Sequence, residues 1–351
     1  MRVTPAIPIT DAIIASTTVV EIPPAAYVGG NPYPLGATVS VGTVGQLLTV
    51  YLSLQADNVD HDPASSPSWW KNIGTTYAVY DPGFSYAAGD MVIDPVAHLI
   101  YESQQAANSG HALATEPTWW LKKGITNSRA MFDLLRNTQT TAPGSLSVTF
   151  TPPSRVDSLA LAGVAATAAE ATVRFGGKTV YSTVKKLIRR EVSGWRDYFF
   201  APFTIQSGLV LYDLPPYIGA EITITLSAPN GSVACGAVGF GSSVYLGVTQ
   251  YDPESDTLNF STVDRDEFGK AEMTPIRNVP KASVKTILDK RLVNKARAVR
   301  AALDATPAFW SGLDDLSHPY AEALFLLGFY RKFTIRLADY DAAEITLDLE
   351  E

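Results

Sequence analysis

The chain has 351 residues, two to three times the size of an ordinary domain, so we expect two to four folded units. Its composition, 46% hydrophobic and 18% charged, excludes a disordered chain, and its net charge of -8 argues against a nucleic-acid partner. A single cysteine, Cys235, excludes an internal disulfide framework and any metal site built from several cysteines.

Residues 1–25 are predicted to form an N-terminal arm. Pro5, Pro8 and Asp11 interrupt what would be the apolar core of a secretory signal, so we expect no signal peptide and synthesis in a cytoplasm. No run of about 18 or more apolar residues occurs, so we also expect no insertion into a membrane.

An internal repeat occupies residues 26–75 and 76–124. The 24 residues from Tyr51 align without gaps on those from Tyr101, and eleven of these positions are identical. The identical positions include two adjacent tryptophans in each copy, Trp69–Trp70 and Trp119–Trp120. Because four of the six Trp in the chain occupy these paired positions, we predict two copies of one small module.

Each copy has the pattern strand, turn, strand, long loop, strand. Adjacent residues of a strand point to opposite faces, so one Trp of each pair should enter the core and the other should face outward. An outward indole ring can lie against the apolar face of a sugar, and the Asn, Gln, Ser and His of the loop are residue types that bind hydroxyl groups. The alternative is that both tryptophans pack against a neighbouring module or subunit.

The order Tyr, Gly-Asp, Val, Tyr, Asn-x-Gly, Pro, Trp in the second copy resembles the small carbohydrate-binding modules attached to chitinases and also found on phage tail proteins. The first copy fits this pattern less closely, since Asp60 stands where the second copy has Gly110. The resemblance implies a set of carbohydrate-binding residues: Trp119, Trp120, Tyr101, Tyr86, Asn108, His111, Trp69, Trp70 and Tyr51.

Residues 125–250 are predicted to form an antiparallel β-sandwich. Stretches such as SLSVTF, ATVRF and EITITLS have the composition of strands and are separated by Pro, Gly and Asn turns. The segment 183–192 fits a helix or a strand by period, and its β-branched residues favour a strand. For the aromatic stretch 195–203, WRDYFFAPF, we expect packing in the core or at a sheet edge.

Residues 251–351 are predicted to form a β-rich α+β module. Asn294 is the expected N-cap of a helix through Ala305, with its apolar face formed by Ala296, Val299, Ala302 and Leu303. The alternation of Ile345, Leu347 and Leu349 with Thr and acidic residues indicates a strand. The predicted fold class of the whole chain is therefore mainly β: two small β repeat modules, a β-sandwich and this C-terminal module.

Residues 124–351, with segments such as VDSLALAGV, WRDYFFAPF, VDRDEFG and a final ITLDLE, resemble minor tail or baseplate proteins of long-tailed bacteriophages. The motifs are framework residues, so the resemblance implies a fold and a setting. It implies a virion component at the tail tip or baseplate, present in several copies per tail and bound to other tail proteins.

No catalytic residue, cofactor or metal is expected. The four His lack the spacing of metal ligands, and no nucleophile or nucleotide-binding motif occurs in a suitable setting. A pair of carboxylates about 5 to 10 Å apart would serve glycoside hydrolysis. The acidic candidates are Asp252, Glu254 and Asp256, which also resemble the start of a calcium loop, and Asp264, Asp266 and Glu267.

The sequence thus predicts a non-enzymatic structural protein of a phage tail tip whose repeats bind host cell-surface glycans, while the N-terminal arm and the two following modules anchor it to other tail proteins. Two other functions stay open. One is a tail depolymerase that cleaves polysaccharide, and the other is a purely architectural protein whose repeats bind only neighbouring subunits. A bacterial chitin-binding adhesin is a further alternative, but it lacks the expected signal peptide.

Overall fold

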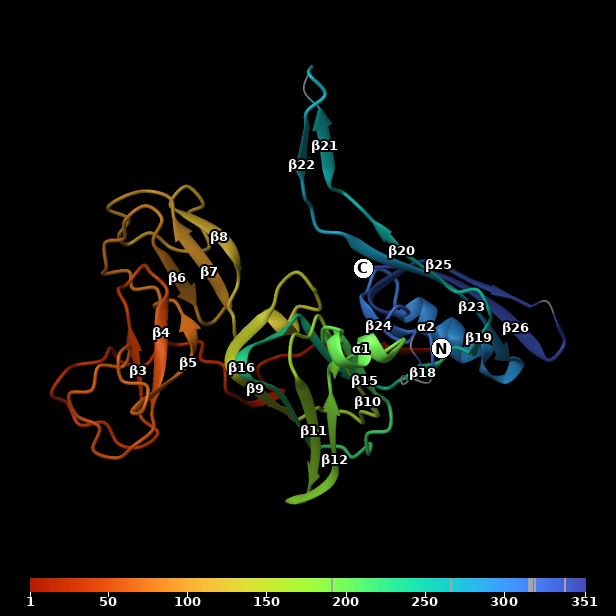
Figure 1. The fold of residues 1–351 in the computed structure, drawn as a ribbon, viewed down its shortest axis with the longest axis horizontal. Coiled ribbons are helices and arrows are strands. Elements are labelled where there is room, and N and C mark those ends of the chain that lie inside the picture. Colours follow the sequence, from red (N-terminus) through yellow and green to blue (C-terminus); the bar gives the residue numbers. More distant parts are fainter. Residues whose placement is uncertain (191, 266, 315–317, 319, 338) are drawn as a thin grey trace.

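The fold is mainly β, with 47% of residues in strands and 6% in helices, which confirms the predicted fold class. The computed structural model describes residues 1–190, 192–265, 267–314, 318, 320–337 and 339–351. Figure 1 shows the two repeats on one side, a twisted sheet in the middle and the C-terminal sheet on the other side.

Each repeat forms a three-stranded antiparallel sheet. The first contains β3 (Thr38–Val41), β4 (Leu48–Ser53) and β5 (Trp70–Thr76), and the second contains β6 (Met91–Asp94), β7 (Leu99–Ser103) and β8 (Trp120–Ile125). The register is the same in both, since Ser53 lies opposite Trp70 and Ser103 lies opposite Trp120, with a bulge at the same place in the middle strand. The sequence repeat is therefore a structural repeat.

Two sheets that share one core follow the repeats. The larger has the strand order β12-β11-β16-β9-β2 and the smaller has the order β15-β10-β17. The strands of the larger sheet are β2 (Ile14–Thr17), β9 (Thr140–Phe150), β11 (Ala168–Phe175), β12 (Lys178–Lys186) and β16 (Glu221–Cys235). Those of the smaller sheet are β10 (Ser158–Ala162), β15 (Gly208–Leu211) and β17 (Ala237–Gly241). The rings of Phe150 and Phe240 meet across the sheets with centroids 5.2 Å apart, so this part is sandwich-like.

The C-terminal sheet has the order β18-β1-β24-β25-β26-β23-β19, and β20 also pairs with β23. Its strands are β1 (Arg2–Pro5), β18 (Val244–Tyr245), β19 (Val248–Thr249), β20 (Glu254–Leu258), β23 (Val279–Asp289), β24 (Ala308–Ser311), β25 (Phe325–Arg336) and β26 (Ala342–Glu350). Since β18 and β19 belong to this sheet, the C-terminal module begins before residue 251.

The segment 1–25 is not a separate arm. Its strand β1 lies inside the C-terminal sheet between β18 and β24, and its strand β2 forms an edge of the sandwich by pairing with β9. The side chain of Val3 is fully buried. Backbone pairing within the chain therefore holds β1 and β2, which corrects the expectation of a separate N-terminal arm.

The helix near residue 294 begins earlier than predicted. The α-helix α2 spans Val293–Ala302 and follows a 3₁₀ turn, η2 (Lys290–Leu292). The carboxylate of Asp289 accepts a hydrogen bond from the backbone N–H of Arg291 at 2.8 Å, so the cap lies five residues before Asn294. Ala296 and Val299 of α2 pack into the C-terminal core, whereas Ala302 is exposed.

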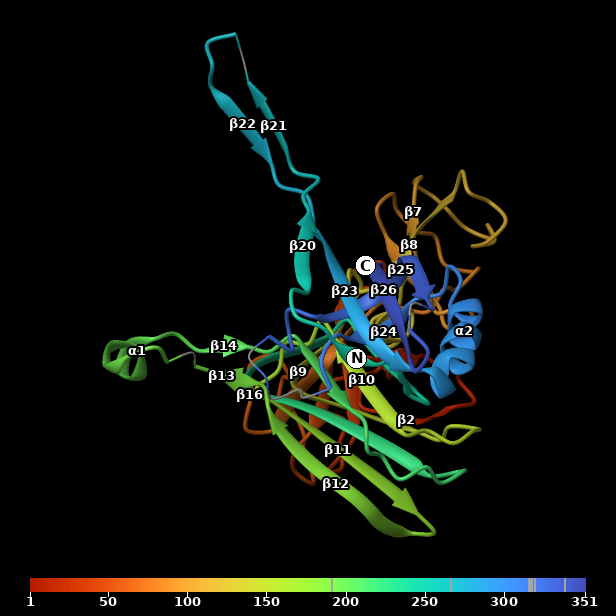
Figure 2. The ribbon, with the colours of Figure 1, turned by 90° about the vertical axis from the view of Figure 1, so that its right-hand side faces the viewer.

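The prediction for segment 183–192 is confirmed as strand as far as Arg189, since β12 continues into β13 (Ile188–Arg189). The prediction for the aromatic stretch is wrong. It forms a short helix, α1 (Trp195–Phe200), of which no residue is buried. The two-residue strands β13 and β14 (Thr204–Ile205) pair with each other and carry α1 away from the sandwich, so no core lies beneath it (Figure 2).

Close packing of two glycines joins the sandwich to the C-terminal sheet. A Cβ atom on Gly239 of β17 would lie 2.2 Å from the ring of Phe309 on β24, and one on Gly208 of β15 would lie 2.3 Å from the ring of Phe325. The Phe309 ring is 1% exposed and has no free space to move into. The absence of a side chain at these positions therefore sets the distance between the two sheets.

An ion-pair cluster fixes the second repeat to the N-terminal segment. The imidazole of His98 bonds the carboxylates of Glu21 at 2.8 Å and Asp11 at 3.0 Å. The guanidinium of Arg129, which follows β8, pairs with Asp11 at 2.8 Å, and the hydroxyl of Thr126 donates to Glu21 at 2.6 Å. Three segments of the chain, the N-terminal segment, the second repeat and the residues that follow β8, thus meet at one partly buried site.

The variant Gly239→Ala should lose about 1 to 3 kcal/mol of stability, because the new methyl group overlaps the buried Phe309 ring. The matched control is Gly231→Ala, where no atom lies within 4 Å of the added Cβ. Urea denaturation of both variants measures the difference. Equal stability of the two would contradict this description of the junction.

The contribution of His98 to stability should depend on pH. Burial alone would lower the pKa of His98, but its hydrogen bonds to Glu21 and Asp11 outweigh burial, and the net pKa is raised. A raised pKa gives stability that is present below the ordinary value near 6.5 and is lost as pH rises through the folded value.

The pKa of Asp11 is lowered, first by its hydrogen bond to His98 and then by the charge of Arg129, so its contribution is lost as pH falls through the folded value. The melting temperature of wild type should therefore exceed that of His98→Gln most at about pH 5 to 6 and least at about pH 9. Thermal scans across this range measure the difference, and a difference that does not vary with pH would refute the role of the cluster.

Candidate functional site

The second Trp of each pair is a core residue. Trp70 and Trp120 begin β5 and β8, and each is 2% exposed. The indole N–H donates to the carbonyl oxygen of His61 at 2.8 Å in the first repeat and of His111 at 2.9 Å in the second. The polar atom of each buried indole is therefore satisfied, and each ring closes the long loop against the sheet.

The first Trp of each pair lies at the surface and is half-buried. An imidazole stacks on each ring: the centroids of His61 and Trp69 are 3.8 Å apart at 14°, and those of His111 and Trp119 are 3.8 Å apart at 11°. The predicted division of each pair into an inward and an outward Trp is thus confirmed, except that one face of the outward ring is covered by histidine.

A buried asparagine holds each outward Trp in place. The amide nitrogen of Asn108 donates to Ser103 Oγ at 2.9 Å and to the carbonyl oxygen of Trp119 at 3.2 Å. The amide of Asn58 makes the equivalent bond to Ser53 Oγ at 3.1 Å. These bonds explain why the repeat keeps Ser and Asn at a spacing of five residues, since they fix the loop that presents the Trp–His stack.

The two repeats differ in what orients the histidine. In the first repeat, His61 Nδ1 bonds Asn58 Oδ1 at 3.0 Å. In the second, His111 Nδ1 bonds the carboxylate of Glu116 at 2.5 Å. The pKa of Glu116 is lowered, first by the backbone N–H of Ala112 and then by His111. Oδ1 of the buried Asn108 consequently has no hydrogen-bond partner among the described residues.

The nine residues of the predicted carbohydrate-binding set fall into two groups. The buried residues, which pack inside the modules, are Trp70, Trp120, Tyr86, Tyr101 and Asn108. The half-buried residues at the surface are Trp69, Trp119, His111 and Tyr51. A ligand can reach only the second group without opening a module, so the candidate site is reduced to it.

A shallow depression of about 340 Å³ lies beside the Trp–His stack of the second repeat. Val79, Tyr80, Asp94, Ala112 and Leu113 contribute to its lining. The Tyr80 hydroxyl donates to the carbonyl oxygen of His111 at 2.7 Å, which links the depression to the stack. The sequence carried a signal for Tyr80, because the offset of 53 that relates Tyr33 to Tyr86 also relates Tyr27 to Tyr80.

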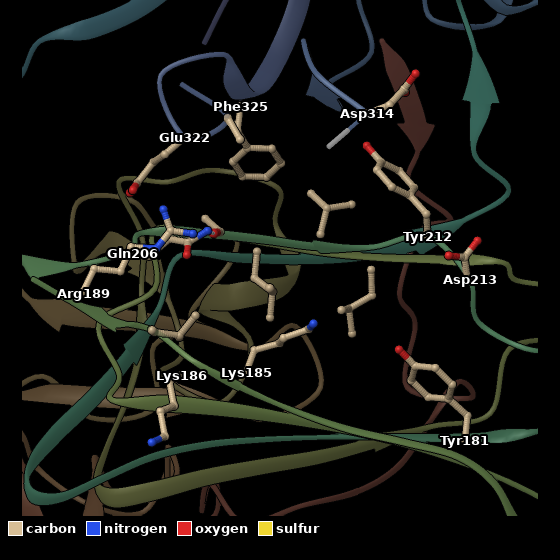
Figure 3. Close-up of a pocket in the computed structure, with 16 residues that line it drawn as sticks. Tyr181, Lys185, Lys186, Arg189, Gln206, Tyr212, Asp213, Asp314, Glu322 and Phe325 are labelled. Atoms are coloured by element: carbon tan, nitrogen blue, oxygen red, sulfur yellow. The ribbon is translucent and has the colours of Figure 1, made fainter. Parts of the chain in front are cut away.

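A second pocket, of about 450 Å³, lies between the sandwich and the C-terminal sheet (Figure 3). Its lining combines tyrosines, basic residues and acidic residues that come from segments far apart in sequence, so no local sequence motif could have indicated the pocket. Lys185 extends toward the space between Tyr181 and Tyr212 (Figure 3). Burial raises the pKa of Tyr212 to about 12, which keeps this phenol protonated at neutral pH.

Two of the three carboxylates that line this pocket are engaged in structural bonds. Glu322 accepts hydrogen bonds from the backbone N–H and the hydroxyl of Ser207, at 2.8 and 3.1 Å. Asp314 pairs with the guanidinium of Arg2 at 3.4 Å. The third acidic residue of the lining is Asp213.

The acidic residues considered from the sequence lie on an exposed strand and ribbon. Glu254 and Asp256 belong to β20, and Asp264 belongs to β21 (Thr262–Arg265). Asp252 and Glu267 are exposed as well, and Asp266 lies outside the described residues. Within the described part of the chain, no group of three or more potential ligands is arranged to hold a metal ion.

Comparison of the chain with protein-family models, with curated proteins and with solved structures finds no match. None of the helices among the described residues has the length and apolar character needed to cross a membrane.

Replacing Trp120 by Phe should destabilise the second repeat by about 1 to 3 kcal/mol, because the carbonyl of His111 loses one of its two donors and the smaller ring leaves part of the core unfilled. Replacing Trp119 by Phe should cost less, since that ring is half-buried and its indole makes no hydrogen bond of this kind. Denaturation followed by circular dichroism compares the two variants. A larger loss for Trp119→Phe would show that the inward and outward roles are reversed.

Proposed function

We propose that this chain is a non-enzymatic structural component of a phage tail tip or baseplate that presents two glycan-binding modules to the host surface. The observation that carries the proposal is the duplicated Trp–His stack. Both repeats hold a half-exposed indole against an imidazole at 3.8 Å, although the surrounding loops differ in sequence. Trp119 also packs against the core of its module, but its ring stays partly exposed, whereas the Trp120 ring is buried.

The chemistry of the stack suits a sugar. An indole face binds the C–H face of a sugar ring, and the imidazole stacked on it supplies a polar group at its edge. Because His111 covers one face of Trp119, a sugar would take the open part of the ring and the neighbouring depression beside Tyr80. A shallow site of this kind implies weak binding to a single module.

Several weakly binding modules on one particle together bind a surface more tightly than one module does. When one module of a particle is bound, the next meets the surface at a high effective concentration, so affinity rises without new contacts. Two repeats per chain and several chains per tail would supply the number of sites that such multivalent binding needs. The likeness of residues 124–351 to minor tail proteins supports the setting, in which other tail proteins are partners and the virion is the location.

Replacing Trp119 by Ala should lower binding of the full chain to its best glycan by about ten-fold, since an aromatic contact of roughly 1.4 kcal/mol is lost. Glycan-array signal followed by calorimetry on the best ligand measures this loss. Trp69→Ala should reduce binding further in the double variant. Tyr251→Ala, which removes a fully exposed aromatic outside the repeats, is the matched control and should leave binding unchanged.

The two competing functions, a depolymerase and a purely architectural protein, predict different results. A depolymerase would release reducing ends from purified capsule or chitin in the absence of other proteins. An architectural protein would show no glycan-array signal, and deletion of residues 26–124 would stop tail assembly. Unchanged glycan binding and host adsorption in the Trp69/Trp119 double variant would refute the proposed site.

A further inference from the structure

A basic, aromatic projection leaves the sandwich at β12. We define the aromatic arm as residues 185–207, which include β13, α1 and β14. Trp195 is 83% exposed and Phe200 is 80% exposed, and no residue of α1 is buried. A helix of six residues with no packed face is not stable by itself in water. The aromatic arm therefore has the character of an element that is stabilised by a partner.

The charge of the aromatic arm contrasts with that of the chain. The arm has five basic and two acidic residues: Lys185, Lys186, Arg189, Arg190 and Arg196 against Glu191 and Asp197. Lys185, Lys186 and Arg189 also line the pocket at the base of the arm, whereas Arg196 belongs to α1. The guanidinium of Arg190 lies 4.2 Å from the centroid of the Phe203 ring and also donates to the carbonyl oxygen of Tyr198. Apolar rings and positive charge are thus presented together, which favours an acidic partner with an apolar surface.

A second projection, the acidic ribbon, comprises residues 254–276 with β20, β21 and β22 (Ala271–Thr274). It has six acidic and two basic residues: Glu254, Asp256, Asp264, Asp266, Glu267 and Glu272 against Arg265 and Lys270. Strands β21 and β22 pair only with each other among the described residues. A two-stranded ribbon without a core is marginally stable in water, so this element also calls for a partner.

The two faces of the ribbon differ. Val263 and Met273 are opposite each other on one face, and they are 54% and 72% exposed. Asp264 and Glu272 are opposite each other on the other face. Like charges in such a cross-strand pair repel, so a cation that binds between them stabilises the ribbon. The ribbon thus has an apolar pair on one face and an acidic pair on the opposite face.

We propose that the aromatic arm of one copy of this chain binds the acidic ribbon of a second copy. The arm supplies apolar rings for the face with Val263 and Met273. Its long basic side chains reach around the edge of the ribbon to Asp264 and Glu272 on the opposite face. Covering five aromatic side chains that are more than half exposed removes on the order of 600 Å² from one partner, close to the ~800 Å² of a standard interface. The proposal goes beyond glycan binding and does not depend on it.

The contact joins two different surfaces, so it is heterologous and leaves a free arm at one end and a free ribbon at the other. Figures 1 and 2 show that the two projections leave the molecule in different directions, which prevents an arm from reaching the ribbon of its own chain. Repetition of such a contact builds a ring if the rotation closes and a filament if it does not.

The test uses two variants of the full chain. The arm variant carries Trp195→Ser and Phe200→Ser, and the ribbon variant carries Asp264→Lys and Glu272→Lys. The second change keeps a like-charged cross-strand pair and reverses only its sign. Because all four side chains are exposed, both variants should keep the circular dichroism spectrum and melting temperature of wild type. Glu170→Lys is the control for a reversal of charge at an exposed position outside the ribbon.

Sedimentation velocity should show wild type and Glu170→Lys forming species larger than a dimer as concentration rises, with weaker association at high salt. Each double variant alone should associate at least about 30-fold more weakly, as expected when a central contact is lost. A mixture of the two variants should form a dimer and nothing larger, because it contains one intact arm and one intact ribbon per pair.

Three results would overturn the proposal. The first is wild-type behaviour of either variant alone. The second is failure of the mixed variants to form the dimer. The third is a wild type that stays monomeric at about 100 µM but floats with vesicles containing phosphatidylserine in a manner abolished by the arm variant, which would assign the arm to a lipid surface.

Discussion

The placement of residues 1–21 is the constraint on which the rest of the structure depends. Their backbone pairs with β18 and β24 in the C-terminal sheet and with β9 in the sandwich, and the carboxylates of Asp11 and Glu21 bind His98 of the second repeat. One short segment therefore connects all three parts of the molecule. Since His98 and Arg129 are both partly buried at this junction, the repeats have a fixed attachment at the second copy.

The fixed attachment matters for the proposed function, because weak glycan-binding sites act together only when the modules that carry them are held in a defined orientation. Within each repeat, interior contacts fix the outward Trp. The buried Trp closes the loop, the buried Asn bonds the backbone of the outward Trp, and the His ring stacks on the outward indole. The outward ring is thus held by packing and hydrogen bonds before any ligand arrives, which lowers the entropy lost on binding. The same logic explains why the Ser, the Asn and the second Trp, which are buried in both copies, are among the identical residues of the repeat.

Much of the fold and of the candidate site could be predicted from the sequence, and the predictions that were wrong have physical causes. Alternation along strands located the β modules and divided each Trp pair, because burial follows the period of two. The alternation could not show that Tyr86, Tyr101 and Asn108 are interior, since aromatic and amide side chains occur both in cores and in binding sites.

Two local predictions were wrong for other reasons. Asn294 is a residue type that caps helices, but the cap is Asp289, which lies before a 3₁₀ turn that extends the start of the helix. The stretch at Trp195 looked like core, because composition does not reveal that two-residue strands lift it away from the sheet.

The most direct test of the central claim follows the six indole N–H signals by NMR while the best-binding glycan of an array is added to the full chain. The account predicts that the signals of Trp119 and Trp69 shift with increasing ligand, while those of the buried Trp120, Trp70 and Trp310 stay in place. Shifts confined to Trp195, or equal shifts of the buried and outward indoles, would contradict it.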